Sequence, residues 1–587
     1  MRELAVLLTE DNPSRQDRRV DKVLKFFGIP SCNLPAAEFA TANVVGDATS
    51  DRPRVVCSAD VFLRWIEDLK RDPDRLQTWG KCFHSVFVYA GGDSRVLQKL
   101  ARILADGNGA VLHEVNPCAG NFVVSDELKD FCGVMAGLEV TGSKDSVDLT
   151  LISHTSNGNA INVISLGSHA TFLKLEYKGV VVFLSTFNNI IDIDAELTSQ
   201  NFDVRDHFLS AVPLVLYIKW AFPETCWNAP ETNACLVIDD PVLKSSHGFV
   251  NFQELLSLMK RHNFGTNIAF IPWNWRRSAP EVVRLFRENP DRFSLSVHGC
   301  DHTRAEFGSS DRQRLYWKTQ QALERMNRHE SITGIRHDGV MVFPQGIFSE
   351  AAMSALKHTD LIAAVNNDII SADPWPRAIT VSDVWDIAVM RYSDFPIFTR
   401  RYPWEGIENF AFDALLGKPV IIIIHHDYCS DHCRRLVDFV DRLNALRCRP
   451  TWRSLGEVVR RSYRQREISP GAVEVEMYAA QLRLENRSHQ RKRYLIRRRE
   501  SEPSSIREIR AGSRNVAWSS TDDMVAFEIE LNPGEKTIVS MAFHDLAGNG
   551  RYVDTVSYRT KAMLRRYLCE VRDNYITPAR VRLAGSC

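Results

Sequence analysis

Short apolar runs alternate with amphipathic helical segments from the start of the chain to about residue 465. Leu4–Leu8 and Ser85–Ala90 are such runs, and Arg18–Phe27 has the spacing of an amphipathic helix. Near-continuous apolar strands separated by helices are typical of parallel sheets with helices on both faces. The alternation therefore predicts an α/β multidomain protein.

Residues 1–228 are predicted to form one α/β domain of flavodoxin-like or glutamine-amidotransferase-like type. The apolar runs Asn162–Leu166 and Val180–Leu184 are expected to extend its sheet. The region contains neither the G-x-G-x-x-G dinucleotide motif nor a nucleophile elbow. We therefore interpret it as a non-catalytic scaffold or ligand-sensing domain.

The pattern changes after about residue 468. Val525–Leu531 and Thr537–Phe543 alternate with period two and are separated by the turn Asn532–Glu535, which predicts a hairpin. Residues 469–587 are thus expected to form a β-sandwich-like domain that ends in a helix over Thr555–Asn574. The central domain is expected over residues 229–468.

Composition excludes several classes of function. Basic and acidic side chains both number 73, so the chain lacks the basic footprint of a nucleic-acid binder. Apolar runs such as Pro419–Ile424 are too short for a membrane helix, and the N-terminus lacks the features of a signal peptide. The 13 cysteines form no repeating framework. We expect a cytoplasmic protein with reduced thiols, and a homo-oligomer is compatible with the sequence.

Two adjacent carboxylates end the first strand of the central domain. Ala234–Pro241 is an apolar run that closes with Asp239 and Asp240. Consecutive residues at a strand end point in different directions, so one carboxylate can hold a metal while the other handles a proton. The alternative is a simple turn, because Asp-Asp-Pro is common turn chemistry.

A pair of histidines follows a second strand, Phe293–Val297. His298 and His302 are four residues apart and can bind one cation if the loop between them curls into a turn. With a carboxylate they form a ligand set that leaves positions open for water and substrate. Two unrelated surface or core histidines are the alternative. A β/α barrel would gather both strand ends on one face.

These segments resemble the polysaccharide deacetylase family, which includes the nodulation-type chitooligosaccharide deacetylases. The family's first motif, Thr-Phe-Asp-Asp-Gly, is similar to Val237–Pro241, and its His-Ser/Thr-x-x-His motif is similar to His298–His302. Its last motif, an apolar strand ending in His-Asp, is similar to Pro419–Asp427. The resemblance covers about residues 232–430 and implies a central (β/α) deacetylase-type barrel.

The resemblance implies roles for individual residues. Asp239 would be the general base, and the metal would be held by Asp240, His298 and His302. The metal would be a divalent ion, with Zn²⁺ expected and Co²⁺ or Ni²⁺ as alternatives. The general acid would be His425 or His426; the pattern does not decide between them, although the His-Asp ending slightly favours His426.

The third motif of the family, Arg-x-Pro-Tyr/x-Gly, is only partly present. Its Pro and Gly are matched by Pro344 and Gly346, while the Arg and Tyr are replaced. The resemblance implies that a backbone N–H near Gln345 holds the oxyanion, and that the missing Arg changes the tuning of Asp239. Pro for Gly in the first motif and Gly for Ser/Thr in the second also indicate a divergent member.

The leading hypothesis is metal-dependent hydrolysis of an N-acetyl or O-acetyl group on a carbohydrate. Trp273 and Trp275 follow a barrel strand and would stack on a sugar ring or pack in the core, and His247 is expected in an exposed loop. One alternative is a metal-free glycoside hydrolase-like barrel that uses Asp239 and a partner carboxylate. Another is a catalytically silent glycan-binding or assembly protein.

Overall fold

The computed structural model describes residues 3–36, 52–72, 83–104, 111–115, 120–141, 149–153, 160–546 and 554–584. The chain divides into two compact units. The first consists of Met1–Ala195, Asp203–Trp227 and Arg466–Ile468, and the second of Glu196–Phe202, Asn228–Gln465 and Ser469–Cys587. Among the described residues, no helix has both the length and the apolar character needed to cross a membrane.

The first unit contains a run of five parallel strands. Their order is β2 (Ser31–Pro35), β1 (Ala5–Thr9), β3 (Arg54–Ser58), β4 (Ser85–Tyr89) and β11 (Val180–Ser185). The helices that connect or cover them are α1 (Arg15–Phe26), α3 (Ala59–Lys70), α5 (Ser94–Leu104) and α7 (Phe208–Ala221). A reciprocal capping box between Ser14 and Asp17 starts α1.

The other half of this sheet differs from the parallel arrangement expected from the sequence. β11 continues into the antiparallel strands β10 (His169–Tyr177), β9 (Ala160–Leu166), β6 (Asn121–Val124) and β7 (Glu139–Thr141). The physical reason is local, because Lys178 and Gly179 both have positive φ (47° and 80°). Two such residues form the tight hairpin turn that reverses the chain between β10 and β11.

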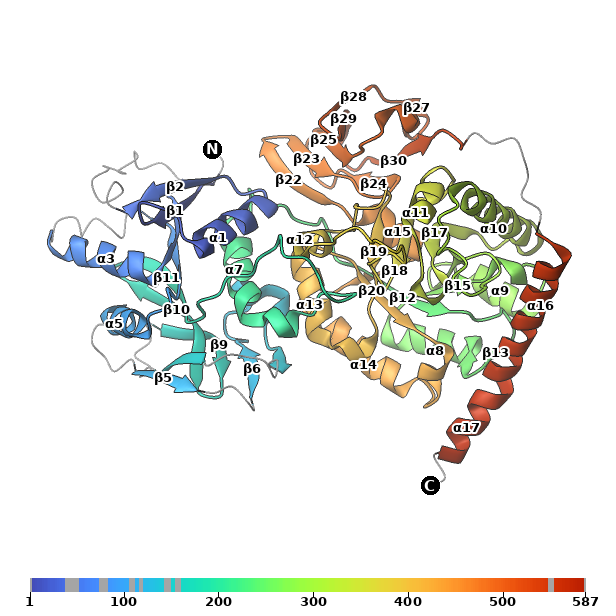
Figure 1. The fold of residues 1–587 in the computed structure, drawn as a ribbon, viewed down its shortest axis with the longest axis horizontal. Coiled ribbons are helices and arrows are strands. Elements are labelled where there is room, and N and C mark those ends of the chain that lie inside the picture. The colour runs from blue at the N-terminus through green and yellow to red at the C-terminus, as the bar shows by residue number, and fades with distance from the viewer. Residues whose placement is uncertain are drawn as a thin grey trace. The chain divides into compact units, whose positions relative to one another are not determined.

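The second unit is built on a parallel sheet that is nearly closed into a barrel (Figure 1). Its strands, in spatial order, are β19 (Ile397–Thr399), β18 (Ala363–Asn366), β17 (His337–Val342), β16 (Phe293–His298), β15 (Thr266–Phe270), β12 (Asn233–Asp239) and β20 (Val420–Ile424). Arg401, just after β19, forms a bridge to β20: its N–H donates to the Ile421 carbonyl oxygen at 3.0 Å, and its carbonyl oxygen accepts from Ile423 N at 2.9 Å. This bridge joins the two edges, so the carboxyl ends of all seven strands meet around one mouth.

Buried β-branched residues and well-capped helices account for this barrel. All five residues of β20, Val-Ile-Ile-Ile-Ile, are buried, as expected for a strand covered on both faces. The intervening helices are α8 (Phe252–His262), α9 (Pro280–Glu288), α10 (Arg312–Thr333), α11 (Glu350–Lys357), α12 (Val381–Trp385), α13 (Ile407–Leu416), α14 (Arg434–Ala445) and α15 (Leu455–Arg461). Asn251 caps α8, and Asp311 caps α10.

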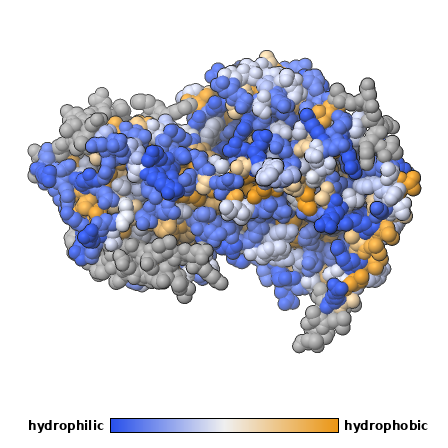
Figure 2. All heavy atoms as spheres, in the orientation of Figure 1, coloured by the Kyte–Doolittle hydropathy of each residue, from blue (hydrophilic) through white to orange (hydrophobic). Residues whose placement is uncertain are grey.

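Two further sheets and a long helix follow the barrel within the second unit. One sheet contains β23 (Ala472–Glu476), β25 (Lys492–Arg499), β29 (Met524–Leu531) and β28 (Trp518–Thr521). The other contains β24 (Gln481–Glu485), β30 (Lys536–Phe543), β26 (Ile506–Ala511) and β27 (Arg514–Asn515). Their buried side chains belong to one hydrophobic cluster. The chain then forms α16 (Val556–Val571), a π-helical turn (Arg572–Ile576) and α17 (Thr577–Ala584), where apolar atoms are visible on the surface (Figure 2).

Candidate functional site

The mouth of the barrel carries the side chains that the sequence analysis singled out. β12 ends at Asp239, Asp240 follows it, and β16 ends at His298. Asp240 and His302 both have positive φ (81° and 56°), which is uncommon for residues other than glycine. Such conformations persist only where the surrounding structure enforces them, and they concentrate at functional sites.

Asp240, His298 and His302 converge on a common point. The Oδ1 atom of Asp240 lies 3.1 Å from His302 Nε2 and 3.5 Å from His298 Nε2. One possible ligand atom from each residue lies within 4.8 Å of the other two. Asp240 Oδ1 is buried and accepts no well-aligned hydrogen bond from the described residues. This donor set suits a divalent metal.

The surroundings of these three groups set their orientation and their charge. The Nδ1 atom of His298 lies 3.0 Å from the carbonyl oxygen of Val342, which orients Nε2 toward Asp240. Burial opposes ionisation of Asp240, but His302 and His298 hold the pKa of its carboxyl well below the ordinary value. Burial would lower the pKa of His298, yet Asp239 and Asp240 together raise it.

Asp239 is clamped by an arginine that sequence analysis missed. Arg400, just after β19, donates to both carboxylate oxygens at 2.7 and 2.8 Å, and both side chains are buried. Burial favours the neutral carboxyl, but Arg400 and then His298 outweigh it and lower the pKa of Asp239. The segment similar to the family's third motif has no Arg, and the arginine that pairs with Asp239 is Arg400, which follows β19. Because Arg400 lies 161 residues from Asp239 in the chain, no local sequence pattern indicated this ion pair.

The loop between the two histidines is shaped by a buried carboxylate. Glu306 accepts hydrogen bonds from the backbone N–H groups of Cys300, Asp301 and His302 at 3.0, 2.9 and 3.0 Å. Gly299 has φ +61°, and a Cβ there would lie 2.3 Å from Pro344 Cγ and 2.7 Å from the Glu306 carboxylate. The glycine that departs from the family motif is therefore required by this chain's own packing.

The partial third motif lies beside the histidine loop. Gln345 adopts φ +61°, accepts a hydrogen bond from Ala305 N at 3.2 Å and lines a cavity next to His302. Pro344 and Gly346 are buried at its sides. A Cβ on Gly346 would lie 2.6 Å from Asp368 Oδ2, so Gly346 allows that carboxylate to approach closely.

The two histidines after β20 have different environments. His425 is partly exposed, its ring lies 6.3 Å from that of Tyr402, and its charge acts on Asp239. His426 is 8% exposed, and its Nε2 atom lies 3.4 Å from Asp573 Oδ1. His247 packs edge-on against His426 with ring centroids 5.7 Å apart.

The expectation that His247 is exposed was wrong. Its side chain is buried, and burial together with the charge of His426 lowers the pKa of His247 to about 4. Gly248, with φ +57°, explains the burial, because a Cβ there would lie 2.3 Å from His426 Nδ1. The glycine lets this loop fold closely onto the end of β20, which the local sequence does not reveal.

The two candidate sugar-stacking tryptophans are both partly buried. Trp273 packs edge-on against Tyr567 of α16 with ring centroids 5.9 Å apart. The guanidinium of Arg276 lies 4.2 Å from the Trp275 ring centroid. The cavity at the barrel mouth is lined by the residues around them, Ile271, Asn274 and Arg277, rather than by either indole ring.

This cavity has a volume of about 190 Å³ and is closed on one side by the C-terminal helix. Its lining includes Asp240 and His302 of the converging trio, and six residues from the C-terminal helical segment: Arg565, Arg566, Cys569, Glu570, Arg572 and Asp573. The Nη2 atom of Arg566 lies 3.3 Å from His302 Nδ1 and 3.4 Å from the His302 carbonyl oxygen. Sequence analysis missed this contribution, because α16 lies far along the chain from every motif.

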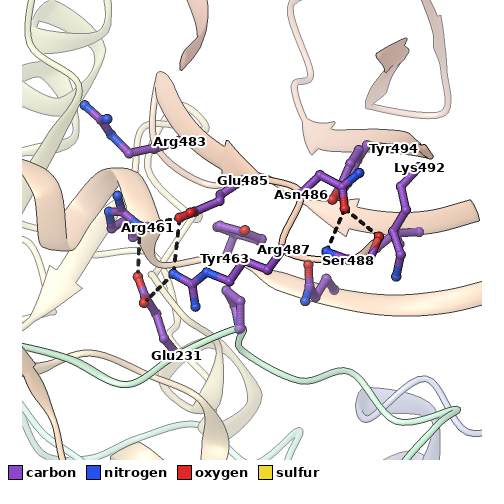
Figure 3. A pocket seen from close by; sticks show the side chains of 13 residues that line it. Glu231, Arg461, Tyr463, Arg483, Glu485, Asn486, Arg487, Ser488, Lys492 and Tyr494 are labelled. Atoms are coloured by element: carbon purple, nitrogen blue, oxygen red, sulfur yellow. Dashed lines mark hydrogen bonds and ion pairs between the residues drawn. The ribbon is translucent and has the colours of Figure 1, made fainter. Parts of the chain in front are cut away.

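Other clusters are less suited to chemistry. Among the described residues, a second group with metal-ligand types is Cys300, Asp301 and Glu306. Asp301, however, already pairs with Lys318 and with Arg325 at 2.6 Å. Figure 3 shows another cavity, at the opposite end of the barrel from Asp239, in which Glu231 pairs with Arg461 and Arg487.

Comparison with known proteins finds no matching family model and no matching curated protein. Among solved structures, the chain is similar to Agd3, described as a novel carbohydrate deacetylase, with a TM-score of 0.48 and 10% identity over 92% of this chain and 98% of that chain. A putative polysaccharide deacetylase from Mycobacterium smegmatis matches with a TM-score of 0.26 and 13% identity, covering 37% of this chain and 86% of that chain. A family 4 carbohydrate esterase from Streptomyces lividans, in complex with acetate, matches with a TM-score of 0.22 and 11% identity, covering 37% of this chain and 86% of that chain. The similar structures thus include carbohydrate deacetylases, the family that the motifs resemble.

Proposed function

We propose that this chain is a divergent metal-dependent hydrolase that removes an acetyl group from a carbohydrate. The observation that carries the proposal is the convergence of Asp240, His298 and His302 beside the arginine-clamped Asp239 at the mouth of a parallel barrel. Catalytic groups in such barrels come from the carboxyl ends of strands. The carbohydrate substrate is inferred from the motifs that resemble the polysaccharide deacetylases.

Asp240, His298 and His302 would hold the divalent cation, with Zn²⁺ expected and Co²⁺ or Ni²⁺ as alternatives. The donor set of one carboxylate and two imidazoles supports this assignment, as does the burial of Asp240 Oδ1 without a well-aligned hydrogen bond from the described residues. When bound, such an ion supplies Lewis acidity that polarises a carbonyl and acidifies water.

Asp239 is the proposed general base. Its lowered pKa keeps the carboxylate ionised at neutral pH, and Arg400 fixes its orientation. The carboxylate would accept a proton from the attacking water. The backbone N–H of Gln345, which lies beside the cavity, is the proposed donor to the oxyanion.

His425 is the proposed general acid, in preference to His426. Ile238 of β12 pairs with Ile424 of β20, so the residues that follow each of them, Asp239 and His425, lie next to each other across the sheet. His426 instead pairs with Asp573. His425 would donate a proton to the departing amine or alcohol.

Metal content and acetate release test the proposal together. We expect about one equivalent of a divalent metal in the purified protein, measured by mass spectrometry, and acetate release from N- or O-acetylated sugars. The variant His298→Ala/His302→Ala should lose both, while Asp239→Asn should keep the metal and lose acetate release. His262→Ala is a matched control, because His262 is remote and pairs with Asp441. A protein that takes up no metal even on reconstitution would contradict the proposal, and metal without turnover would indicate a glycan-binding protein.

The assignment of the acid has its own test. His425→Ala is expected to lower kcat by about 10²–10⁴-fold, the usual contribution of a general acid, with metal content unchanged. His426→Ala should have a smaller effect on kcat. The opposite order of the two kcat values would assign the acid to His426.

A further inference from the structure

The C-terminal helix presents two chemically different faces. Its polar face contacts the barrel: Glu570 pairs with Arg277 at 2.5 Å and with Lys244, and Asp573 pairs with His426. Gly248 N donates to Asn574 Oδ1 at 2.7 Å. A helix of a globular protein normally buries its apolar stripe and exposes its polar one. Here the polar stripe is docked.

The apolar face of the same helix is exposed. Its large apolar side chains recur at helical spacing and are accessible to solvent: Val556 (80%), Met563 (46%), Leu564 (57%), Leu568 (60%), Val571 (47%), Tyr575 (71%) and Ile576 (44%). Figure 2 shows this stripe as the hydrophobic surface over α16. Scattered exposed apolar residues are ordinary, but a contiguous stripe on one helix marks an interaction surface.

Positive charge borders this stripe. Between residues 556 and 580 the sequence carries six basic side chains. Of these, Lys561 and Arg572 are exposed and lie three residues from Leu564 and four residues from Leu568, respectively, and so flank the stripe. The segment has only two acidic side chains, Glu570 and Asp573, and both turn toward the barrel to pair with its cations. The outward face is therefore apolar at its centre and basic along one edge.

We propose that this outward face of α16 binds an anionic lipid surface. An apolar stripe with basic borders is the pattern of helices that lie in the plane of a membrane interface, where apolar side chains enter the acyl boundary and Lys and Arg attract anionic headgroups. A second copy of the chain fits less well, because two such faces would bring like charges together with no exposed acidic partner on this helix. Since α16 also lines the cavity, the bound lipid surface would lie close to the barrel mouth.

Vesicle co-sedimentation tests this inference with the full-length protein. We expect it to bind vesicles of phosphatidylcholine plus phosphatidylglycerol, to bind pure phosphatidylcholine much less, and to lose binding as salt is raised. Leu564→Asp/Leu568→Asp should weaken binding by at least about tenfold, because each leucine loses its apolar burial in the lipid. Lys561→Glu should weaken it mainly at low salt.

A control variant on another helix tests whether vesicle binding depends on this face of α16. Ile332→Asp changes a leucine-sized residue that is 65% exposed on α10, and it should leave vesicle binding unchanged. Circular dichroism checks that each variant is folded. Equal binding to both vesicle types, or full binding by Leu564→Asp/Leu568→Asp, would overturn the inference. Absence of binding to the anionic vesicles would also overturn it, and a dimer that the leucine variant dissociates would then assign this face to a second copy of the chain. Lipid binding needs no acetate release, so it succeeds or fails independently of the proposed activity.

Discussion

Asp239 and Arg400 form a two-point ion pair in which the side chains are only 4% and 1% exposed. A charge so deeply buried is tolerated when its partner is present, and removing one partner of such a pair costs about 3–5 kcal/mol. The two parallel hydrogen bonds also fix the direction of the carboxylate. Arg400 thus determines both the ionisation and the orientation of the proposed base.

Replacing Arg400 should change the pH dependence of the reaction. In Arg400→Met, burial acts on Asp239 without its main opposing cation, so the pKa of the carboxyl rises. The ionised base is then lost at a higher pH as the solution is acidified, and the acid limb of kcat/KM moves to higher pH. Arg377→Met, at an exposed pair with Glu350, is the control. An unchanged acid limb in an active, folded Arg400→Met protein would show that Asp239 is not the titrating base.

The elements that present the site are strands that end together and loops held in unusual conformations. The loop after β16 curls because the Glu306 carboxylate accepts hydrogen bonds from its backbone N–H groups. Gly299, which has no Cβ, leaves space for Pro344 of the neighbouring loop. The two loops are therefore packed as one unit. The residue types that permit this, a glycine and a glutamate four to six residues from the N–H groups it binds, determine the shape of the loop and are not among the proposed metal ligands.

Substitution of Gly299 should disturb this unit. In Gly299→Ser, the left-handed backbone costs about 1–2 kcal/mol, and the contact with Pro344 adds about 1–3 kcal/mol of overpacking. We expect a lower Tm and weaker metal binding. Gly534→Ser is a matched control, because Gly534 has φ +73° but nothing within 4 Å of its Cβ position. If both variants lost the same stability and metal affinity, the close packing would be irrelevant.

At the scale of the whole molecule, the second unit brings together segments from distant parts of the chain. The cavity combines Asp240 after β12, His302 after β16 and Asp573 beyond α16. An ion held by Asp240, His298 and His302 would link β12 to the loop after β16. A ligand that binds only the folded state stabilises it by mass action.

Removing the metal should therefore destabilise the fold. At an ion concentration about a thousand times the Kd, the stabilisation is about 4 kcal/mol, so a chelator should lower the Tm by several degrees. Restoring the ion should restore the Tm. The chelator should have no effect on His298→Ala/His302→Ala, which lacks two ligands. Equal chelator sensitivity of both proteins would show that a stabilising ion is bound elsewhere.

The sequence by itself determined the features that depend on neighbouring residues. The mixed α/β architecture and the parallel barrel sheet follow from apolar strands alternating with helices, and Asp239, Asp240 and His298 lie at strand ends because polar residues directly follow buried runs. The His-x-x-x-His spacing allowed its two rings to meet only if the loop between them curled, and in the structure their centroids are 4.7 Å apart.

Only the tertiary structure decided the features that depend on residues distant in sequence. The arginine beside Asp239, the burial of His247 and the closure of the cavity by α16 are three such features. They arise from contacts between residues that are 161, 179 and 264 positions apart in the chain, respectively. The antiparallel half of the first sheet depends on hairpin turns rather than on strand composition. Local patterns determine which residues form a strand or helix, but which of them meet depends on the packing of the complete chain.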